Sequence, residues 1–104
     1  MVKEFKPYYA VIFTSKLNAE VIGYQEMSIL MEELATQQSG YLGIESARSE
    51  IGITVSYWQT LEDINNWKQQ SDHLVAQKLG REKWYCWYEI KICKVEREYS
   101  FNMI

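Results

Sequence analysis

The spacing of apolar residues first follows the alternation of a strand and then the longer repeat of a helix. Residues 8–15 (YYAVIFTS) are rich in aromatic and β-branched side chains, which favour extended structure, and they predict a buried strand. Between residues 24 and 38, apolar side chains recur every three or four positions, so this segment predicts an amphipathic helix. Gly40 follows at a position where a left-handed turn would end that helix.

Two short alternating segments come next and predict a hairpin. Residues 41–48 (YLGIESAR) place Leu42, Ile44 and Ser46 on one face. Residues 53–58 (ITVSYW) form the second segment, and the residues between the two segments are enough for a tight turn. The pattern therefore predicts the second and third strands.

A second helical segment begins with a capping motif. Thr60 can accept the early backbone amide protons of a helix, and Asp63 can reach back to the first amide. The polar residues 69–71 predict a kink or break in this helix. A second helical piece is expected over residues 72–79, and Gly80 would close it.

The longest extended segment ends the chain. Residues 84–101 alternate in character, but the phase of the alternation shifts by one residue after Ile92, which predicts a β-bulge. The order of elements is strand, helix, strand, strand, helix, strand. This order predicts an α+β fold of the ferredoxin-like βαββαβ type. Residues 1–104 would form a single domain with both helices on one face of an antiparallel sheet.

Apolar side chains on both faces of the first strand predict a homodimer. Those that point one way are Tyr8, Ala10 and Ile12, and those that point the other way are Tyr9, Val11 and Phe13. Two helices can cover only one face of the sheet, and a large exposed apolar face is typical of a binding surface. We therefore expect two copies to pack sheet against sheet as a dimeric α+β barrel, with the long last strand crossing to the partner.

The charge balance and the cysteines exclude several classes of function. With a net charge of -3 and a pI near 5.2, the chain lacks the positive surface that nucleic acids and anionic membranes require. It contains no apolar run of the ~18 residues that a membrane span needs and no export signal, so we expect a cytoplasmic protein. Cys86 and Cys93 fall on opposite faces of one strand and are expected to stay reduced, without a metal.

Residues 57–88 concentrate aromatic side chains around the single histidine of the chain. This segment contains all four tryptophans, three tyrosines and His73. Rings around a titratable imidazole suit a flat apolar ligand, and they equally suit the core of a small domain. The candidate catalytic residues are Trp67 and His73, and the candidate substrate-binding residues are Arg48, Trp58, Trp84 and Tyr88.

Each candidate also has a purely structural explanation. His73 could move a proton from a phenol or ligate heme iron, but it could equally be a helix-surface histidine. Trp67 could line a cavity or fill the core. Arg48 and Arg81 could bind a carboxylate, or they could form surface ion pairs. No Ser/His/Asp arrangement or Gly-rich phosphate loop offers another chemistry.

Three segments together resemble a known superfamily. They are GYLGIESAR (residues 40–48), residues 56–85 around SYWQTLEDINNWKQQSDHLV, and VEREYSF (residues 95–101). In this order they resemble the antibiotic biosynthesis monooxygenase (ABM) superfamily of dimeric α+β barrels. The resemblance implies several activities. Some members oxidise polycyclic phenols to quinones with O₂ and without metal or flavin, some degrade heme, and many have no established activity.

The heme-degrading branch of that superfamily provides a pattern that this chain matches only in part. The branch uses an Asn on the first strand together with a Trp and a His on the second helical segment. By resemblance, Trp67 and His73 would take the last two roles. The first strand has no Asn, and the nearest, Asn18, lies in the following loop.

These observations leave three functions open. The first is a small monooxygenase that oxidises a planar aromatic substrate with O₂ between helices and sheet and requires no cofactor. The second is a heme-binding or heme-degrading monooxygenase, in which heme is the partner molecule. The third is a non-catalytic small-molecule-binding or stress-related dimeric module, so the sequence leaves open whether the protein is an enzyme.

Overall fold

The chain forms one layer of strands and one layer of helices. A computed structural model describes residues 4–77 and 84–103. Its elements, in order, are β1 (Tyr8–Leu17), α1 (Tyr24–Thr36), β2 (Tyr41–Arg48), β3 (Gly52–Trp58), α2 (Leu61–Gln77) and β4 (Tyr85–Val95). The predicted βαββαβ order is confirmed.

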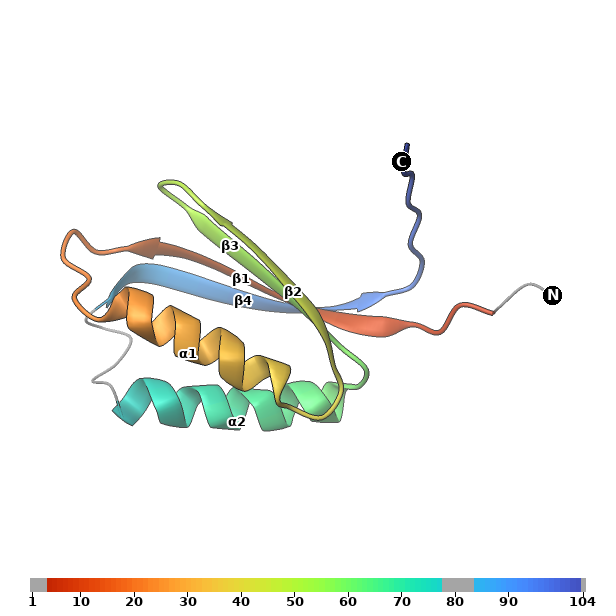
Figure 1. Cartoon of the computed structure of the whole chain (residues 1–104), viewed down its shortest axis with the longest axis horizontal. Helices are drawn as coiled ribbons and strands as arrows, with labels where there is room; N and C mark the ends of the chain where they lie inside the picture. Colours follow the sequence, from red (N-terminus) through yellow and green to blue (C-terminus); the bar gives the residue numbers. More distant parts are fainter. Residues whose placement is uncertain (1–3, 78–83, 104) are drawn as a thin grey trace.

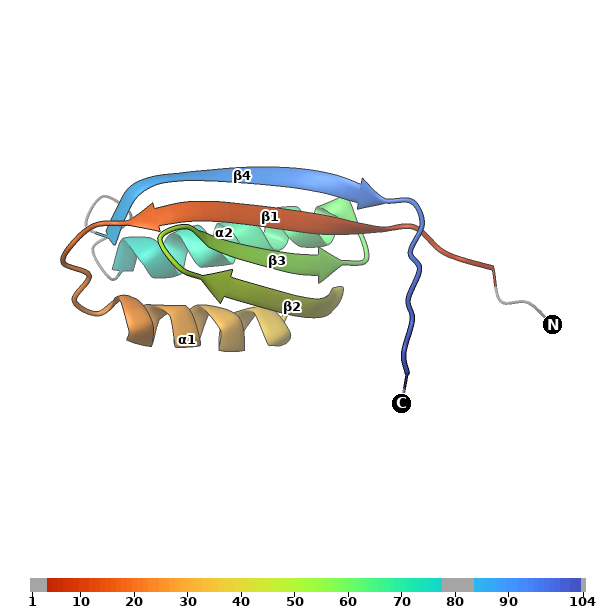
Figure 2. The ribbon, with the colours of Figure 1, turned by 90° about the horizontal axis from the view of Figure 1, so that it is seen from above.

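The four strands form an antiparallel sheet in the order β2-β3-β1-β4, with both helices on one face (Figure 1). Seen from above, the sheet lies in front of α2, with α1 beside β2, and its outer face is uncovered (Figure 2). Because side chains alternate along a strand, each strand has one set of residues toward the helices and another on the outer face. Val11, for example, faces the helices beside Ser56 and Ile92, whereas Ile12 pairs with Val55 on the outer face.

The first helix ends earlier than the position of Gly40 suggested. α1 ends at Thr36, and Gln37 caps it in a right-handed conformation. Gly40 instead lies in the turn before β2, where its φ of 81° is one that L side chains rarely adopt. A Cβ at this position would also overlap the carboxylate of Asp63. Gly40 therefore allows the turn to pass close to the start of α2.

The second helix is continuous, so the predicted kink at residues 69–71 is wrong. The Thr60 hydroxyl accepts a hydrogen bond from the backbone N–H of Asp63 at 3.0 Å, which confirms this part of the predicted cap. The Ser71 hydroxyl donates to the backbone carbonyl oxygen of Lys68 at 3.0 Å without interrupting the helix. The predicted end at Gly80 lies outside the described residues.

Two register details also differ from the prediction. A register shift between Tyr41 and Gly43 turns Leu42 out of the alternation, so it does not share a face with Ile44. The pairing of β4 with β1 is regular from Tyr88 to Val95, so the β-bulge predicted after Ile92 is wrong. The irregularity lies at the other end of β4, opposite Lys16 and Leu17.

The last strand ends where its partner does. Tyr8, the first residue of β1, pairs with Val95, the last residue of β4. Among the residues that the structure describes, residues 96–103 have no neighbouring strand, and they extend away from the body of the protein (Figures 1 and 2). The observed strand β4 therefore ends at Val95, six residues before the predicted end at Phe101.

The buried core lies between the helices and one end of the sheet. Trp58 is fully buried, and its indole N–H donates to the Ser56 hydroxyl at 2.9 Å. Its ring stacks on Trp67 with centroids 5.7 Å apart and contacts Tyr41 edge to face at 5.8 Å. These three rings form the Trp58 cluster, which packs against Ile64 of α2.

Two phenol–carboxylate hydrogen bonds lie on the outer face. Tyr8 donates to Glu98 at 2.5 Å, and Tyr57 donates to Glu45 at 2.9 Å. The hydrogen bond to Glu98 raises the pKa of Tyr8 to about 12, and the bond to Glu45 raises the pKa of Tyr57 in the same way. Both phenols are therefore neutral at physiological pH.

Candidate functional site

A cavity of about 520 Å³ lies between the helices and the sheet. Its floor is the helix-facing side of the sheet, where Val11, Phe13, Ile44, Ile90 and Ile92 contribute apolar side chains. Pockets of a few hundred Å³ with apolar walls and a few polar groups are typical of small-molecule sites. The space is therefore large enough and apolar enough for a planar aromatic molecule.

An aromatic group closes the opposite end of the cavity from the Trp58 cluster. We call it the Tyr85 cluster, and its members are Phe13, Tyr24, Trp84, Tyr85 and Tyr88, with ring centroids 5.4 to 6.2 Å apart. The Trp84 indole N–H donates to the backbone carbonyl oxygen of Ile22 at 2.9 Å, which fixes this ring.

The half-buried phenol of Tyr85 in this cluster stays protonated. Burial, followed by the neighbouring Tyr24, raises the pKa of Tyr85 above its usual value. A neutral phenol in an apolar wall can donate a hydrogen bond to an oxygen atom of a bound ligand. The hydroxyl groups of Tyr85 and Tyr24 also hydrogen-bond to each other, and this pair provides a hydrogen-bond donor at this end of the cavity.

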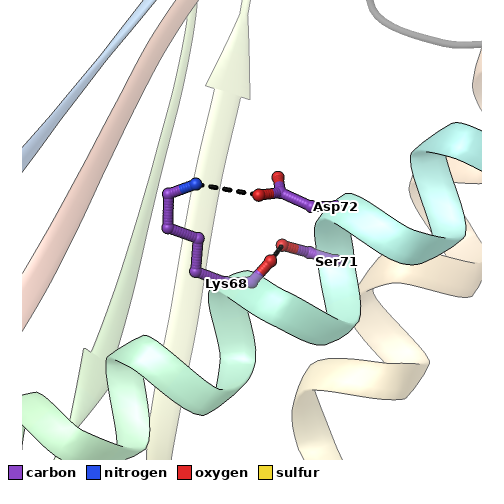
Figure 3. A network of polar contacts seen from close by, with 3 residues as sticks. All are labelled: Lys68, Ser71 and Asp72. Carbon is purple, nitrogen blue, oxygen red and sulfur yellow. Dashed lines mark hydrogen bonds and ion pairs between the residues drawn. The ribbon is translucent and has the colours of Figure 1, made fainter.

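The two helices give the cavity polar groups as well as apolar ones. From α1, Met27 and Met31 line the cavity together with Ser28 and Glu32. From α2, the lining residues are Ile64, Trp67, Lys68, Ser71 and Asp72. Figure 3 shows the polar part of α2, in which the Lys68 ammonium lies 2.8 Å from an Asp72 carboxylate oxygen.

The structure brings three of the predicted site residues together at the cavity. Trp67 lines it near the Trp58 cluster, whereas Trp84 and Tyr88 line it near the Tyr85 cluster. Trp58 lies behind Trp67 as fully buried support and is not among the described lining residues.

The other predicted site residues lie elsewhere. His73 is exposed on α2 and is not among the described residues that line the cavity, so its catalytic role stays a prediction. Arg48 donates to the Ser15 hydroxyl at 2.5 Å, and its guanidinium lies 5.8 Å from the centre of the Tyr24 ring. Arg81 lies outside the described residues.

Gly52 is the residue that lets Arg48 reach Ser15. A Cβ at this position would overlap the guanidinium of Arg48, which crosses β3 to reach β1. We expect Gly52→Ala to displace Arg48 and to reproduce the effect of Arg48→Ala, namely a loss of stability of about 1 kcal/mol from the broken charge-assisted bond. Urea denaturation of both single variants and of the double variant checks this. Additive losses in the double variant would contradict the shared cause.

The sequence interpretation missed Lys68 and Asp72. Their position in the cavity lining was not recognised from the sequence, because charged residues on a helix usually face solvent. Their spacing from Ile64 by four and eight positions was the available signal, because such residues share one helix face. Tyr85 is one of the three tyrosines noted in residues 57–88. The irregular pairing at the start of β4 sets it opposite Leu17, on the helix-facing side of the sheet, where it lines the cavity.

Two further properties concern metals and membranes. Among residues 4–77 and 84–103, no three His, Cys, Asp or Glu side chains lie close enough together to bind a metal ion. Within the same part of the chain, neither helix is both long and apolar enough to cross a bilayer. Cys86 and Cys93 are free thiols.

Comparison with known proteins connects this chain to a family and a fold. No protein-family model matches the sequence. The uncharacterized protein YqjZ of Bacillus subtilis (strain 168) is 43% identical over 98 residues, which cover 92% of this chain and 86% of YqjZ.

Solved structures share the architecture at low sequence identity. A mutant of SnoaB, described as a cofactor-independent oxygenase from Streptomyces nogalater, superposes with a TM-score of 0.71 at 9% identity and covers 88% of this chain and 95% of its own. A Nitrosomonas europaea protein, whose name assigns it provisionally to the antibiotic biosynthesis monooxygenases, has a TM-score of 0.64 at 12% identity. That alignment covers 92% of this chain and 96% of the other. The chain therefore belongs to the family of YqjZ, and its fold is that of the ABM superfamily, which the sequence segments resembled.

Proposed function

We propose that the protein is a small monooxygenase that oxidises a planar phenol with O₂ in the cavity between helices and sheet. The observation that carries this proposal is the cavity itself, about 520 Å³ in volume, with an apolar floor and aromatic groups at both ends. The description of SnoaB as a cofactor-independent oxygenase supports the same chemistry on this fold.

The proposed oxidation requires the protein mainly to remove a proton from the substrate and to hold the substrate in a fixed orientation. Removing a proton from a bound phenol gives an electron-rich anion that can reduce O₂. One oxygen atom enters the quinone product and the other leaves as water, so the reaction needs no external reductant. The protein contributes an oriented substrate held between apolar and aromatic side chains. Trp67 and Trp84 would be the walls, and the hydrogen-bonded pair of Tyr24 and Tyr85 would donate a hydrogen bond to a substrate oxygen.

The placement of the imidazole favours a phenol over heme as the ligand. Heme iron needs an axial ligand at the ligand site. His73, the candidate ligand, is exposed and does not belong to the described lining, and β1 carries no Asn.

We also propose that the protein is a homodimer joined through the outer face of the sheet. Ile12 and Val55 form an apolar strip along the two central strands of this face, and Ile53 is 47% exposed. The apolar side chains of the C-terminal segment are Tyr99, Phe101 and Met103, which are 86–88% exposed. The radius of gyration of 15.3 Å exceeds the ~13 Å expected for a compact chain of this length. An extended C-terminal segment that packs on a second copy would account for this difference.

Oxygen uptake with anthrone tests the proposed activity. The protein is expected to accelerate O₂ consumption over the protein-free rate and to yield anthraquinone in equal amount. Thr54→Trp, which places a large ring on the cavity floor, should abolish the acceleration, whereas Ser49→Trp in the exposed hairpin should not. Absence of acceleration by the unmodified protein, or full activity of a folded Thr54→Trp variant, would overturn the proposal.

A further inference from the structure

Charged side chains occupy positions on α2 where an amphipathic helix normally places apolar ones. The cavity-facing side of this helix is Ile64, Trp67, Lys68, Ser71 and Asp72. These positions are spaced like the apolar stripe of a helix that packs on a sheet. A departure from the local pattern at such positions is typical of a functional site.

Helix stability does not account for the Lys68–Asp72 ion pair. The lysine precedes the aspartate by four positions, which is the less favourable order with respect to the helix dipole. The two side chains are 57% and 40% exposed, and pairs of this kind contribute little to folding. The pair nevertheless lies beside the apolar floor of the cavity, within reach of a ligand that occupies it.

The charges around the cavity favour a neutral ligand that carries a transferable proton. The other charged residue of the described lining is Glu32 on α1, so two carboxylates face one ammonium group. The remaining titratable groups of this lining are the phenols of Tyr24, Tyr85 and Tyr88. The Arg48 guanidinium, 5.8 Å from the centre of the Tyr24 ring, adds a positive charge just outside the lining at the Tyr85 cluster. Away from that end, an anionic ligand would meet two carboxylates and one ammonium group, whereas a neutral phenol would not be repelled.

We infer that Lys68 and Asp72 form a proton-transfer pair for a neutral phenol, an assignment that rests on the function proposed above. The phenol O–H bond breaks and its proton forms a new O–H bond with the Asp72 carboxylate. Lys68 then pairs with the phenolate oxygen in place of Asp72. The net charge of the cavity does not change, and no electron is transferred in this step.

This pair also restricts the class of substrate. A carboxylate is a far weaker base than an ordinary phenolate, so it can deprotonate only a phenol whose anion is strongly stabilised. Conjugation of the hydroxyl group with a ring carbonyl provides that stabilisation. The substrate class is therefore a planar aromatic molecule with a hydroxyl group conjugated to a ring carbonyl.

The probe for this step is 2-hydroxyanthraquinone, which changes colour when it loses its proton. Bound to the unmodified protein, it is expected to show the colour of its anion at a pH where the free dye is neutral. Calorimetry in two buffers of different ionisation enthalpy should show less proton release than in Asp72→Asn, because Asp72 accepts the proton of the dye. Lys68→Met should leave the bound dye neutral, whereas Lys68→Arg should preserve the anion colour. Asp72→Asn should give the anion colour with release of about one proton per dye, because the carboxylate that would accept the proton is missing.

Controls separate the failure of this inference from the failure of the proposed function. Lys6→Met and Glu33→Gln remove the same charges from exposed positions that do not line the cavity, and they should behave like the unmodified protein. Neutral dye on the unmodified protein, or proton release equal to that of Asp72→Asn, would overturn the pair. If anthraquinone without the hydroxyl group binds normally in that case, only the pair is wrong. If anthraquinone does not bind either, the proposed cavity function fails as well.

Discussion

Trp58→Ala is expected to destabilise the protein by about 4 kcal/mol, near the centre of the range for truncating a large buried ring. Trp58 is fully buried, stacks on Trp67 and donates to the buried Ser56 hydroxyl, so truncation removes packing on both sides and leaves a cavity. For a domain of this size the loss corresponds to a decrease in Tm of roughly 20 °C. Urea denaturation at one fixed protein concentration measures the free energy of unfolding.

Trp58→Phe is the matched control for this prediction. It preserves a ring against Trp67 and loses the hydrogen bond to Ser56, for which we expect about 1–2 kcal/mol. A loss below about 1 kcal/mol for Trp58→Ala would show that the Trp58 cluster does not organise the core.

Ile53→Glu is expected to convert the proposed homodimer into monomers. Ile53 is 47% exposed on the outer face in a single chain, so the substitution should cost the folded monomer little. In a sheet-to-sheet dimer, the same carboxylate would be buried without a partner, which is strongly unfavourable. We expect the dimer Kd to rise at least ~100-fold, which corresponds to about 2.8 kcal/mol. Light scattering on a gel-filtration peak should change from about twice the chain mass of 12.4 kDa to that mass.

Ile22→Glu provides the matched control for the dimer. Ile22 is 76% exposed and precedes α1, away from the outer face of the sheet. This variant should retain the dimer mass. A monomer mass for the unmodified protein, or a dimer mass for Ile53→Glu, would contradict the sheet-to-sheet arrangement.

The local pattern of residues was enough to predict the elements, because strands and helices differ in the period of their apolar residues. The predicted bounds of the second strand, residues 41–48, and the predicted start of the first helix at Tyr24 were correct. The end of β4 could not be predicted in this way. It depends on Tyr8, which is far away in sequence and marks the point where the partner strand begins.

The candidate site was only partly predictable, because the sequence does not distinguish aromatic residues that line a cavity from those that fill the core. Trp58 and Trp67 contact each other, but the pairing of Trp58 with Tyr9 on the central strands places it behind Trp67. His73 and Asp72 are neighbours in sequence, yet only Asp72 lines the cavity, because adjacent helix residues point in different directions. Such distinctions depend on tertiary packing and cannot be obtained from composition or spacing.

The central claim is that the space between helices and sheet is a binding site for a planar aromatic molecule. A titration with anthraquinone, followed by tryptophan fluorescence, tests it most directly, because Trp67 and Trp84 line that space. The account predicts saturable binding of one molecule per chain, lost in Thr54→Trp and unchanged in Ser49→Trp. Fluorescence that does not saturate, or equal binding by a folded Thr54→Trp variant, would contradict it.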